Sequence, residues 1–266
     1  MANAVRERTG SFTSLGGTLF KIRSYTLVPV AVALLVLPWV LSPDPEWAYS
    51  WMIGLGLGLL AIGTLVRFHV SGRSPRGTST RGKTIGAAQL VTCGCYAYSR
   101  NPLYVANALL WFGIASLTGI PLLLIPVFLI LVLQYYAIVL AEEEYLRDKF
   151  GDEFDIYCRN VPRFLPRLRP WSGRSEPFVF TWKRAIFKEH DTLYGTLACA
   201  TIVVTPVFFS EPSQAVLIAW FGGFAVLTVV WRIVKTLKRQ DSRARRNPTP
   251  SQPAAVVVQS AHMARA

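Results

Sequence analysis

Cysteine and histidine are scarce in this 266-residue sequence, which contains four cysteines and three histidines. Cys93 and Cys95 are separated by a single residue, whereas zinc-binding cysteine pairs are usually separated by two to four. The histidines are scattered along the chain, so we predict no metal site. Disulfides are not expected either, because the cysteines fall in segments that we assign to a membrane span or to the cytoplasmic side.

Charged residues are also few. They make up 16% of the chain, whereas 52% of its residues are hydrophobic. The apolar residues occur in blocks, which indicates a membrane protein rather than a soluble domain of this length. A helix that crosses a bilayer needs about 20 apolar residues. We predict six spans, at residues 25–41, 47–66, 103–119, 120–140, 193–210 and 214–234.

The longest stretch without any charge runs from Leu103 to Leu140, and it is too long for one span. Gly119 and Pro121 lie in its middle and favour a tight reversal of the chain. We therefore predict two antiparallel helices joined by a very short turn. In the preceding span, the glycine-rich segment 54–60 is predicted to allow close helix packing.

Lysine and arginine are absent from every second connection between the predicted spans, namely "SPDPE", "TGI" and "SEPS". The basic residues are concentrated in the other connections and at both ends of the chain. The positive-inside rule therefore places both termini in the cytoplasm. The net charge of +13 follows this topology and suits anionic lipid, so we expect no nucleic-acid partner. The first apolar block lacks a small-residue cleavage site, so no signal peptide is predicted.

These patterns predict an all-α integral membrane protein of four parts. They are a basic cytoplasmic lead at 1–23, a membrane core at 24–170, a cytoplasmic linker with two more spans at 171–238, and a disordered basic tail at 239–266. After the fourth span, apolar residues recur at helical intervals through Tyr157. We expect this helix to continue into the cytoplasm and to end before Pro162.

Two polar groups flank the charge-free hairpin. One is the stretch "CYAYSRNPLY" at 95–104, and the other is the run Glu142-Glu143-Glu144. Because a hairpin returns the chain to the same side of the membrane, the two groups can meet there. Carboxylates suit the ammonium or ribose hydroxyls of a ligand, and aromatic faces attract positively charged groups such as a sulfonium. The layout fits a cationic cytosolic cofactor that meets a membrane-dissolved partner.

Each of these features also has a purely structural interpretation. Arg100 is equally expected as a topology anchor, and the three glutamates as a solvated helix face. Asn101 and Pro102 form a common helix start, with Asn as the cap. The tyrosines fit an interfacial belt. Taken alone, these residues leave both a cofactor pocket and an ordinary membrane boundary open.

The order of the pieces resembles the isoprenylcysteine carboxyl methyltransferase family, which belongs with the membrane phospholipid methyltransferases. The segments "LVTCGCYAYSRNPLYVAN" at 90–107 and "EEEYLRDKFGDEFDIYCRNVPRFLP" at 142–166 are similar to its two motifs, and the resemblance covers about residues 50–170. It implies S-adenosylmethionine as the cofactor, no metal, and a site on the cytoplasmic face, here of a bacterial inner membrane. The implied cofactor-binding residues are Leu90, Val91, Tyr96, Asn101, Pro102, Leu103, Tyr104, Glu142 and Glu143, with the loop positions Arg81, Ala88 and Gln89 as further candidates.

Two positions depart from the pattern of this family. Asn101 stands where the family has histidine, so an imidazole is replaced by an amide that can still form a hydrogen bond. Ile138 stands where the eukaryotic prenylcysteine enzymes carry a substrate-binding arginine, so we do not expect a prenylcysteine carboxylate as the substrate. The catalytic candidates are Arg100, Asn101 and Glu143, and no general base is assigned.

The residues and the resemblance together predict methyl transfer to a lipophilic or amphiphilic membrane acceptor, either a lipid headgroup or a small hydrophobic oxygen, nitrogen or sulfur nucleophile. Candidate acceptor contacts, suited to a phosphate-bearing lipid, are Arg163, Arg184, Glu189 and His190; the alternative for each is a positive-inside linker. A non-catalytic transporter, a lipid-binding scaffold and an adaptor that uses the basic tail are the alternative functions. The absence of acidic residues from the predicted spans disfavours ion coupling.

Overall fold

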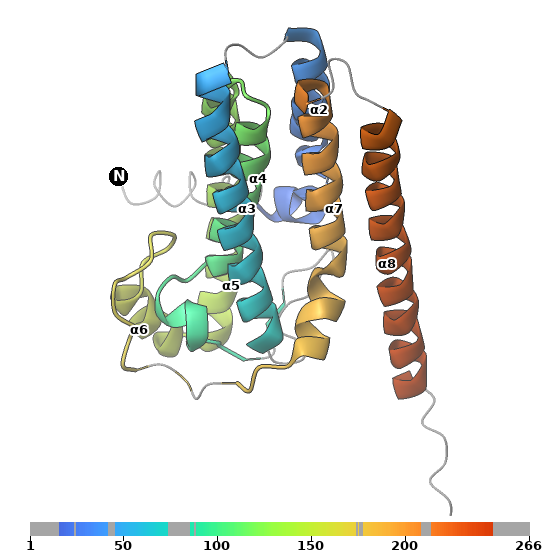
Figure 1. Ribbon diagram of the computed structural model, residues 1–266. Helices are drawn as coiled ribbons and strands as arrows, with labels where there is room; N and C mark the ends of the chain where they lie inside the picture. Colours follow the sequence, from blue (N-terminus) through green and yellow to red (C-terminus); the bar gives the residue numbers. More distant parts are fainter. Residues whose placement is uncertain are drawn as a thin grey trace, which may run out of the picture.

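The computed structural model describes residues 16–23, 25–41, 46–73, 86–87, 89–173, 175, 178–208 and 214–246. Within these ranges the regular structure is entirely helical, as predicted. The helices are α2 (Val28–Leu41), α3 (Glu46–Arg73), α4 (Pro102–Leu117), α5 (Leu124–Phe150), α6 (Asp152–Asn160), α7 (Trp182–Phe208) and α8 (Gln214–Arg246), with 3-10 turns η1 (Gly94–Ala97) and η2 (Pro121–Leu123). Figure 1 shows α3, α4 and α5 grouped together, with α2 and α7 beside them and α8 at the edge.

Three helical stretches of the described chain are long and apolar enough to cross a membrane: Ser50–Arg73, Pro121–Phe150 and Gln214–Ala244. A fourth is possible if Gly16–Arg23 and Val28–Leu41, which meet at a bend of 55°, act as one span. Helix α4 has 16 residues and is therefore about 24 Å long, shorter than a hydrocarbon core of about 30 Å. That the chain crosses the membrane six times remains a prediction.

The predicted reversal within the charge-free stretch is confirmed. Helix α4 ends at Leu117, and α5 begins at Leu124 after the short turn η2. Gly119 between them has a φ of +69°, a conformation that glycine adopts without a steric penalty. The Thr118 hydroxyl donates a hydrogen bond of 2.6 Å to the carbonyl oxygen of Ala115 and closes the end of α4. The turn thus returns α5 alongside α4 (Figure 1).

Helices α3 and α4 approach each other closely at glycines. A Cβ atom on Gly113 would lie 2.7 Å from Cδ2 of Leu60 and 3.0 Å from the carbonyl oxygen of Gly56. The close packing predicted for segment 54–60 is confirmed at Gly56, whereas a Cβ atom added to Gly54 or Gly58 would meet none of the described residues of other elements within 4 Å. Small residues allow this approach because lipid-embedded helices associate mainly through backbone and side-chain packing. A core of buried apolar residues from α2, α4, α5 and α7 continues this contact and includes Leu34, Leu110, Leu131 and Val203.

The helix predicted to run without interruption from the fourth span through Tyr157 is broken. Helix α5 ends at Phe150, and Gly151 follows with a φ of +53°. The Gly151 amide donates a hydrogen bond of 2.8 Å to the carbonyl oxygen of Arg147, which caps α5, and α6 starts at the next residue. The left-handed glycine therefore turns the chain where apolar periodicity alone indicated continuity. Helix α6 does end before Pro162, as predicted.

Two boundaries in the C-terminal part also differ from prediction. Helix α7 begins at Trp182, so the second half of the predicted linker is helical. Helix α8 continues to Arg246, into the tail that composition predicted to be disordered from residue 239. No proline or glycine interrupts residues 235–246, and an ion pair of 2.6 Å between Lys183 of α7 and Asp241 of α8 holds this extension in place. Residues 247–266 lie outside the described part of the chain.

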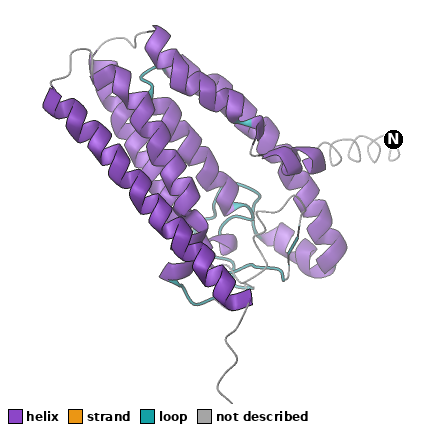
Figure 2. Cartoon of the chain, turned by 90° about the vertical axis from the view of Figure 1, so that its right-hand side faces the viewer, coloured by secondary structure: helices purple, strands orange, loops and turns teal. Residues whose placement is uncertain are grey.

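The helix ends that carry the two motifs gather at one end of the bundle. The C-terminal ends of α3, α5 and α8 lie there with the starts of α4 and α7 and with α6 (Figure 1). The turned view in Figure 2 places loops and short helical turns at the same end. This arrangement brings sequence-distant polar segments into one region.

Candidate functional site

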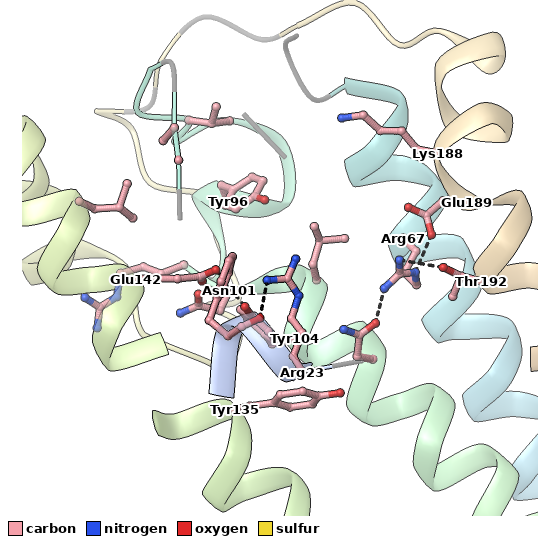
Figure 3. A pocket seen from close by; sticks show the side chains of 18 of the residues that line it. Arg23, Arg67, Tyr96, Asn101, Tyr104, Tyr135, Glu142, Lys188, Glu189 and Thr192 are labelled. Atoms are coloured by element: carbon pink, nitrogen blue, oxygen red, sulfur yellow. Dashed lines mark hydrogen bonds and ion pairs between the residues drawn. The ribbon is translucent and has the colours of Figure 1, made fainter. Parts of the chain in front are cut away.

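A cavity of about 1140 Å³ lies at this end of the bundle, between the start of α4, the end of α5, the start of α7 and the end of α8 (Figure 3). Of the predicted cofactor residues, Leu90, Val91, Tyr96, Asn101, Leu103, Tyr104, Glu142 and Glu143 line it, as does Gln89. Pro102 is buried in the first turn of α4 and is not part of the lining. Arg81 and Ala88 lie outside the described residues.

The two motifs meet at a hydrogen bond in the wall of this cavity. The hydroxyl of Tyr104, on the first turn of α4, donates to Oε1 of Glu142 on α5 over 2.9 Å. Proline at the start of α4 fixes the first turn and directs Tyr104 toward α5. The Tyr104 ring also lies against Tyr135, with 5.1 Å between the ring centroids. The Glu142 carboxylate is therefore oriented by a phenol on the edge of an open space (Figure 3).

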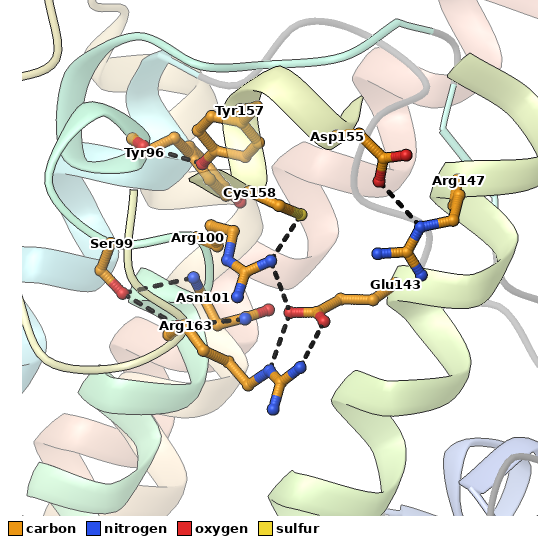
Figure 4. A network of polar contacts seen from close by, with 10 residues as sticks. All are labelled: Tyr96, Ser99, Arg100, Asn101, Glu143, Arg147, Asp155, Tyr157, Cys158 and Arg163. Atoms are coloured by element: carbon orange, nitrogen blue, oxygen red, sulfur yellow. Dashed lines mark hydrogen bonds and ion pairs between the residues drawn. The ribbon is translucent and has the colours of Figure 1, made fainter. Parts of the chain in front are cut away.

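Glu143 is directed differently from Glu142, although the two residues are adjacent. Its carboxylate accepts hydrogen bonds of 3.0 and 2.7 Å from Nε and Nη2 of Arg163, and Nη1 of Arg100 lies 3.3 Å from Oε1 (Figure 4). Glu143 is only 6% exposed. Hydrogen bonding to Glu143 raises the pKa of the Arg163 guanidinium. This ion cluster ties α5 to the segment that follows α6.

Arg100 and Asn101 also form hydrogen bonds to α6 and to the segment that follows it. Nη1 of Arg100 donates to Sγ of Cys158 on α6 at 2.5 Å, and the Arg100 amide donates to the carbonyl of Pro162 at 2.9 Å. Nδ2 of Asn101 donates to the carbonyl of Arg163 at 3.1 Å. Asn101 occupies the N-cap position of α4, which begins at Pro102 as predicted, but its side chain makes no capping hydrogen bond.

The segment that follows α5 packs against the 3-10 turn η1. The hydroxyl of Tyr157 donates to the carbonyl of Tyr96 at 2.8 Å, and the Trp171 amide donates to the carbonyl of Ala97 at 3.0 Å. Burial raises the pKa values of the Tyr96 and Tyr157 phenols above their usual range. Backbone and phenol contacts together thus hold Tyr96 at the cavity wall.

A second polar cluster lies on the α7 side of the cavity. Nε of Arg67 pairs with Oε2 of Glu189 at 2.6 Å, and Arg67 also donates to Asn107 and, over 3.2 Å, to Thr192 (Figure 3). Neither Arg67 nor Asn107 was among the residues predicted for a site. One signal was available, since Arg67 is a charge within an otherwise uncharged helical stretch, and such charges usually find a partner. Arg23, taken as part of the basic lead, also lines the cavity.

The four predicted acceptor contacts do not form one cluster. Arg184 and Glu189 line the cavity, whereas Arg163 is bound to Glu143 and is not part of the lining. His190 is buried beside Asp191, with 3.2 Å between Nε2 and Oδ1, and is not part of the lining either. A shared clamp by these residues on a phosphate is therefore not supported by their positions. Among the described residues, no group of three or more His, Cys, Asp or Glu side chains is placed to hold a metal ion.

Comparison with known proteins identifies the same region of the chain. The "Nickel-cobalt-cadmium resistance protein NccN" of Alcaligenes xylosoxydans xylosoxydans is 31% identical over 160 residues, which cover 57% of this chain and 68% of that protein. The "Cobalt-zinc-cadmium resistance protein CzcN" of Cupriavidus metallidurans is 31% identical over 152 residues, covering 54% of this chain and 64% of that protein. No solved structure gives a significant match. The phospholipid methyltransferase profile matches residues 51–153, which contain the first motif, the hairpin and the glutamates. The chain belongs to the phospholipid methyltransferase family, within the isoprenylcysteine/phospholipid methyltransferase superfamily.

Proposed function

We propose that the protein transfers a methyl group from S-adenosylmethionine to a lipophilic or amphiphilic acceptor at the cytoplasmic face of a membrane. The observation that carries the proposal is the hydrogen bond between Tyr104 and Glu142, which joins the two motifs at the wall of a large cavity. Family membership supports methyl transfer as the reaction class. The two relatives are named as metal resistance proteins, and their names state no reaction.

The lining residues fit this cofactor. Glu142 offers a carboxylate for an ammonium or for ribose hydroxyls, while Tyr96 and Tyr104 offer aromatic faces for a flat ring and for a sulfonium. Small-molecule pockets usually measure about 300–1,000 Å³. The cavity of about 1140 Å³ therefore has room for a cofactor and for part of an acceptor. Leu90, Val91 and Leu103 add apolar surface beside the tyrosines.

When bound, S-adenosylmethionine supplies a methyl group already activated by a positively charged sulfur. The chain's own residues then need only to bind, orient and exclude water, because holding two reactants in line supplies much of the rate acceleration. Tyr104 keeps the Glu142 carboxylate directed to one side of the cavity. The Glu143, Arg100 and Arg163 cluster keeps the covering segment in place, so we assign these three residues to positioning.

The test is isothermal titration of S-adenosylmethionine and S-adenosylhomocysteine into the detergent-purified protein. We expect micromolar binding by the wild type and a loss of at least tenfold in Glu142→Ala. The matched control is Glu144→Ala, because Glu144 is exposed, lies two residues away and does not line the cavity. Failure of the folded wild type to bind either compound would refute the cofactor site and favour a scaffold or transporter.

A further inference from the structure

The Arg67 and Glu189 pair lines the same cavity as Tyr104 and Glu142, but it lies on the opposite side, against α7 (Figure 3). Glu189 is 4% exposed, and its helix lies beyond the family match, which ends at residue 153. Removing charges from water is unfavourable unless their partners compensate. Glu189 is buried and Arg67 is partly buried, so a charged pair of this kind beside a cavity is a candidate ligand contact.

The pair has hydrogen-bonding capacity that its protein contacts do not use. Of the five N–H donors of Arg67, the described residues take one each through Glu189, Asn107 and Thr192. The Glu189 carboxylate has about four acceptor positions, and two donors reach it, Arg67 Nε and the Ser71 hydroxyl. Donor and acceptor capacity thus remain next to each other at the cavity wall.

The cavity that the pair lines has both polar and aromatic walls. Thr192 and Lys188 lie near the pair (Figure 3). Trp111, Tyr135, Phe187 and Leu27 add aromatic and apolar surface to the lining. Such a cavity suits an amphiphilic molecule whose polar group forms hydrogen bonds to Arg67 and Glu189 while its apolar body lies against the rings.

We propose that the Arg67 and Glu189 pair is the acceptor subsite, and that it recognises an uncharged hydroxyl on an amphiphile such as an alkylphenol or a lipid alcohol. A hydroxyl both donates and accepts, so it matches a guanidinium N–H beside a carboxylate. At the pair itself, a phosphate would meet the Glu189 carboxylate and an ammonium would meet the Arg67 guanidinium. Because Arg184 and Lys188 also line the cavity, a phosphate is the competing ligand that the test has to exclude. The assignment of this subsite to methyl acceptance rests on the proposed function, whereas its binding preference can be measured independently.

Three probes with the same apolar body separate the possibilities: 4-butylphenol, 4-butylphenyl phosphate and 4-butylbenzylamine. Each is titrated calorimetrically into the full-length protein in lipid nanodiscs, with and without S-adenosylhomocysteine, and empty nanodiscs give the blank. We expect saturable binding of 4-butylphenol to the wild type and at least tenfold weaker binding to Glu189→Gln. The matched control Glu144→Gln, at an exposed glutamate outside the cavity lining, is expected to bind like the wild type.

Because Glu189→Gln leaves Arg67 without its counterion, the double variant Arg67→Gln/Glu189→Gln provides a second test without a buried charge. The proposal would be overturned if the single or the double variant folds and binds 4-butylphenol as tightly as the wild type. Preference of the wild type for the phosphate or the amine would do the same, as would failure to bind any probe. If the phenol binds but S-adenosylhomocysteine does not, the subsite stands and the methyltransferase assignment fails.

Discussion

Adjacent glutamates in the second motif have different surroundings, although both line the cavity. Glu142 receives one phenol hydrogen bond at the cavity wall, while the carboxylate of Glu143 is occupied by two arginines. On a helix, successive residues point about 100° apart, so neighbours in the sequence face different elements. The motif predicted both glutamates as cofactor ligands, and the geometry favours Glu142 for that role.

At the residue scale, we predict that Tyr104→Phe weakens binding of S-adenosylhomocysteine roughly tenfold. The substitution removes the hydroxyl that orients Glu142 but keeps the ring against Tyr135. A hydrogen bond to a charged group contributes about 1.5–3 kcal/mol, and about 1.4 kcal/mol corresponds to tenfold in affinity. Calorimetric titration of both proteins measures the difference.

The matched control is Tyr98→Phe, because Tyr98 is exposed and does not line the cavity. If Tyr104→Phe bound as tightly as this control, the hydroxyl would have no part in preparing the site.

At the element scale, we predict that Gly113→Ala destabilises the α3 and α4 pair by about 1–3 kcal/mol, the usual cost of overpacking. The new methyl would meet the Leu60 side chain at 2.7 Å and the backbone oxygen of Gly56 at 3.0 Å. Gly58→Ala is the control, since nothing lies within 4 Å of its position. In thermal unfolding measured in detergent, we expect a lower midpoint than that of the wild type for Gly113→Ala only. Equal midpoints for Gly113→Ala and Gly58→Ala would contradict the close contact.

Sequence patterns predicted elements best where one local signal dominated. The glycine and proline of the hairpin turn, Gly119 and Pro121, fixed its position, and the prolines after α6 fixed its end. Apolar periodicity could not report the break at Gly151, because the same apolar residues recur on both sides of it. Helix α7 starts earlier than its apolar run because Lys183, Arg184, Lys188 and Glu189 form a polar first half that hydropathy does not detect as part of a membrane helix.

The site was predictable only as far as the motifs extend. Residues 90–104 and Glu142 could be placed together from the hairpin. Arg67, Asn107 and Thr192 could not, since their meeting depends on how α7 packs across α3 and α4. Nothing in the local sequence of Arg67 indicates that Glu189, 122 residues away, is its partner. Such contacts belong to the tertiary structure.

At the scale of the whole molecule, the direction of the helices supports the prediction of six spans. Helices α3, α5 and α8 all run toward the end that holds the cavity (Figure 1). If these three cross the membrane, α4 and α7 must return the chain to the far side, although α4 is short. With α2 this would make six crossings, and the positive-inside rule would then predict a cytoplasmic location for the basic cavity end.

Two kinds of reporter fusion test this topology. The intact N-terminal portion up to each junction is fused either to alkaline phosphatase, which is active only outside the cytoplasm, or to green fluorescent protein. We expect phosphatase activity for junctions after Asp44 and after Pro212, and fluorescence for junctions after Ser175 and after Arg246. The fusions after Ser175 and Pro212 are each other's control, because they differ by α7 alone. Phosphatase activity after both would mean that α7 does not cross. The start of α7, which carries Glu189, would then lie outside the cytoplasm, and a cytoplasmic cavity shared by cofactor and acceptor would no longer be tenable.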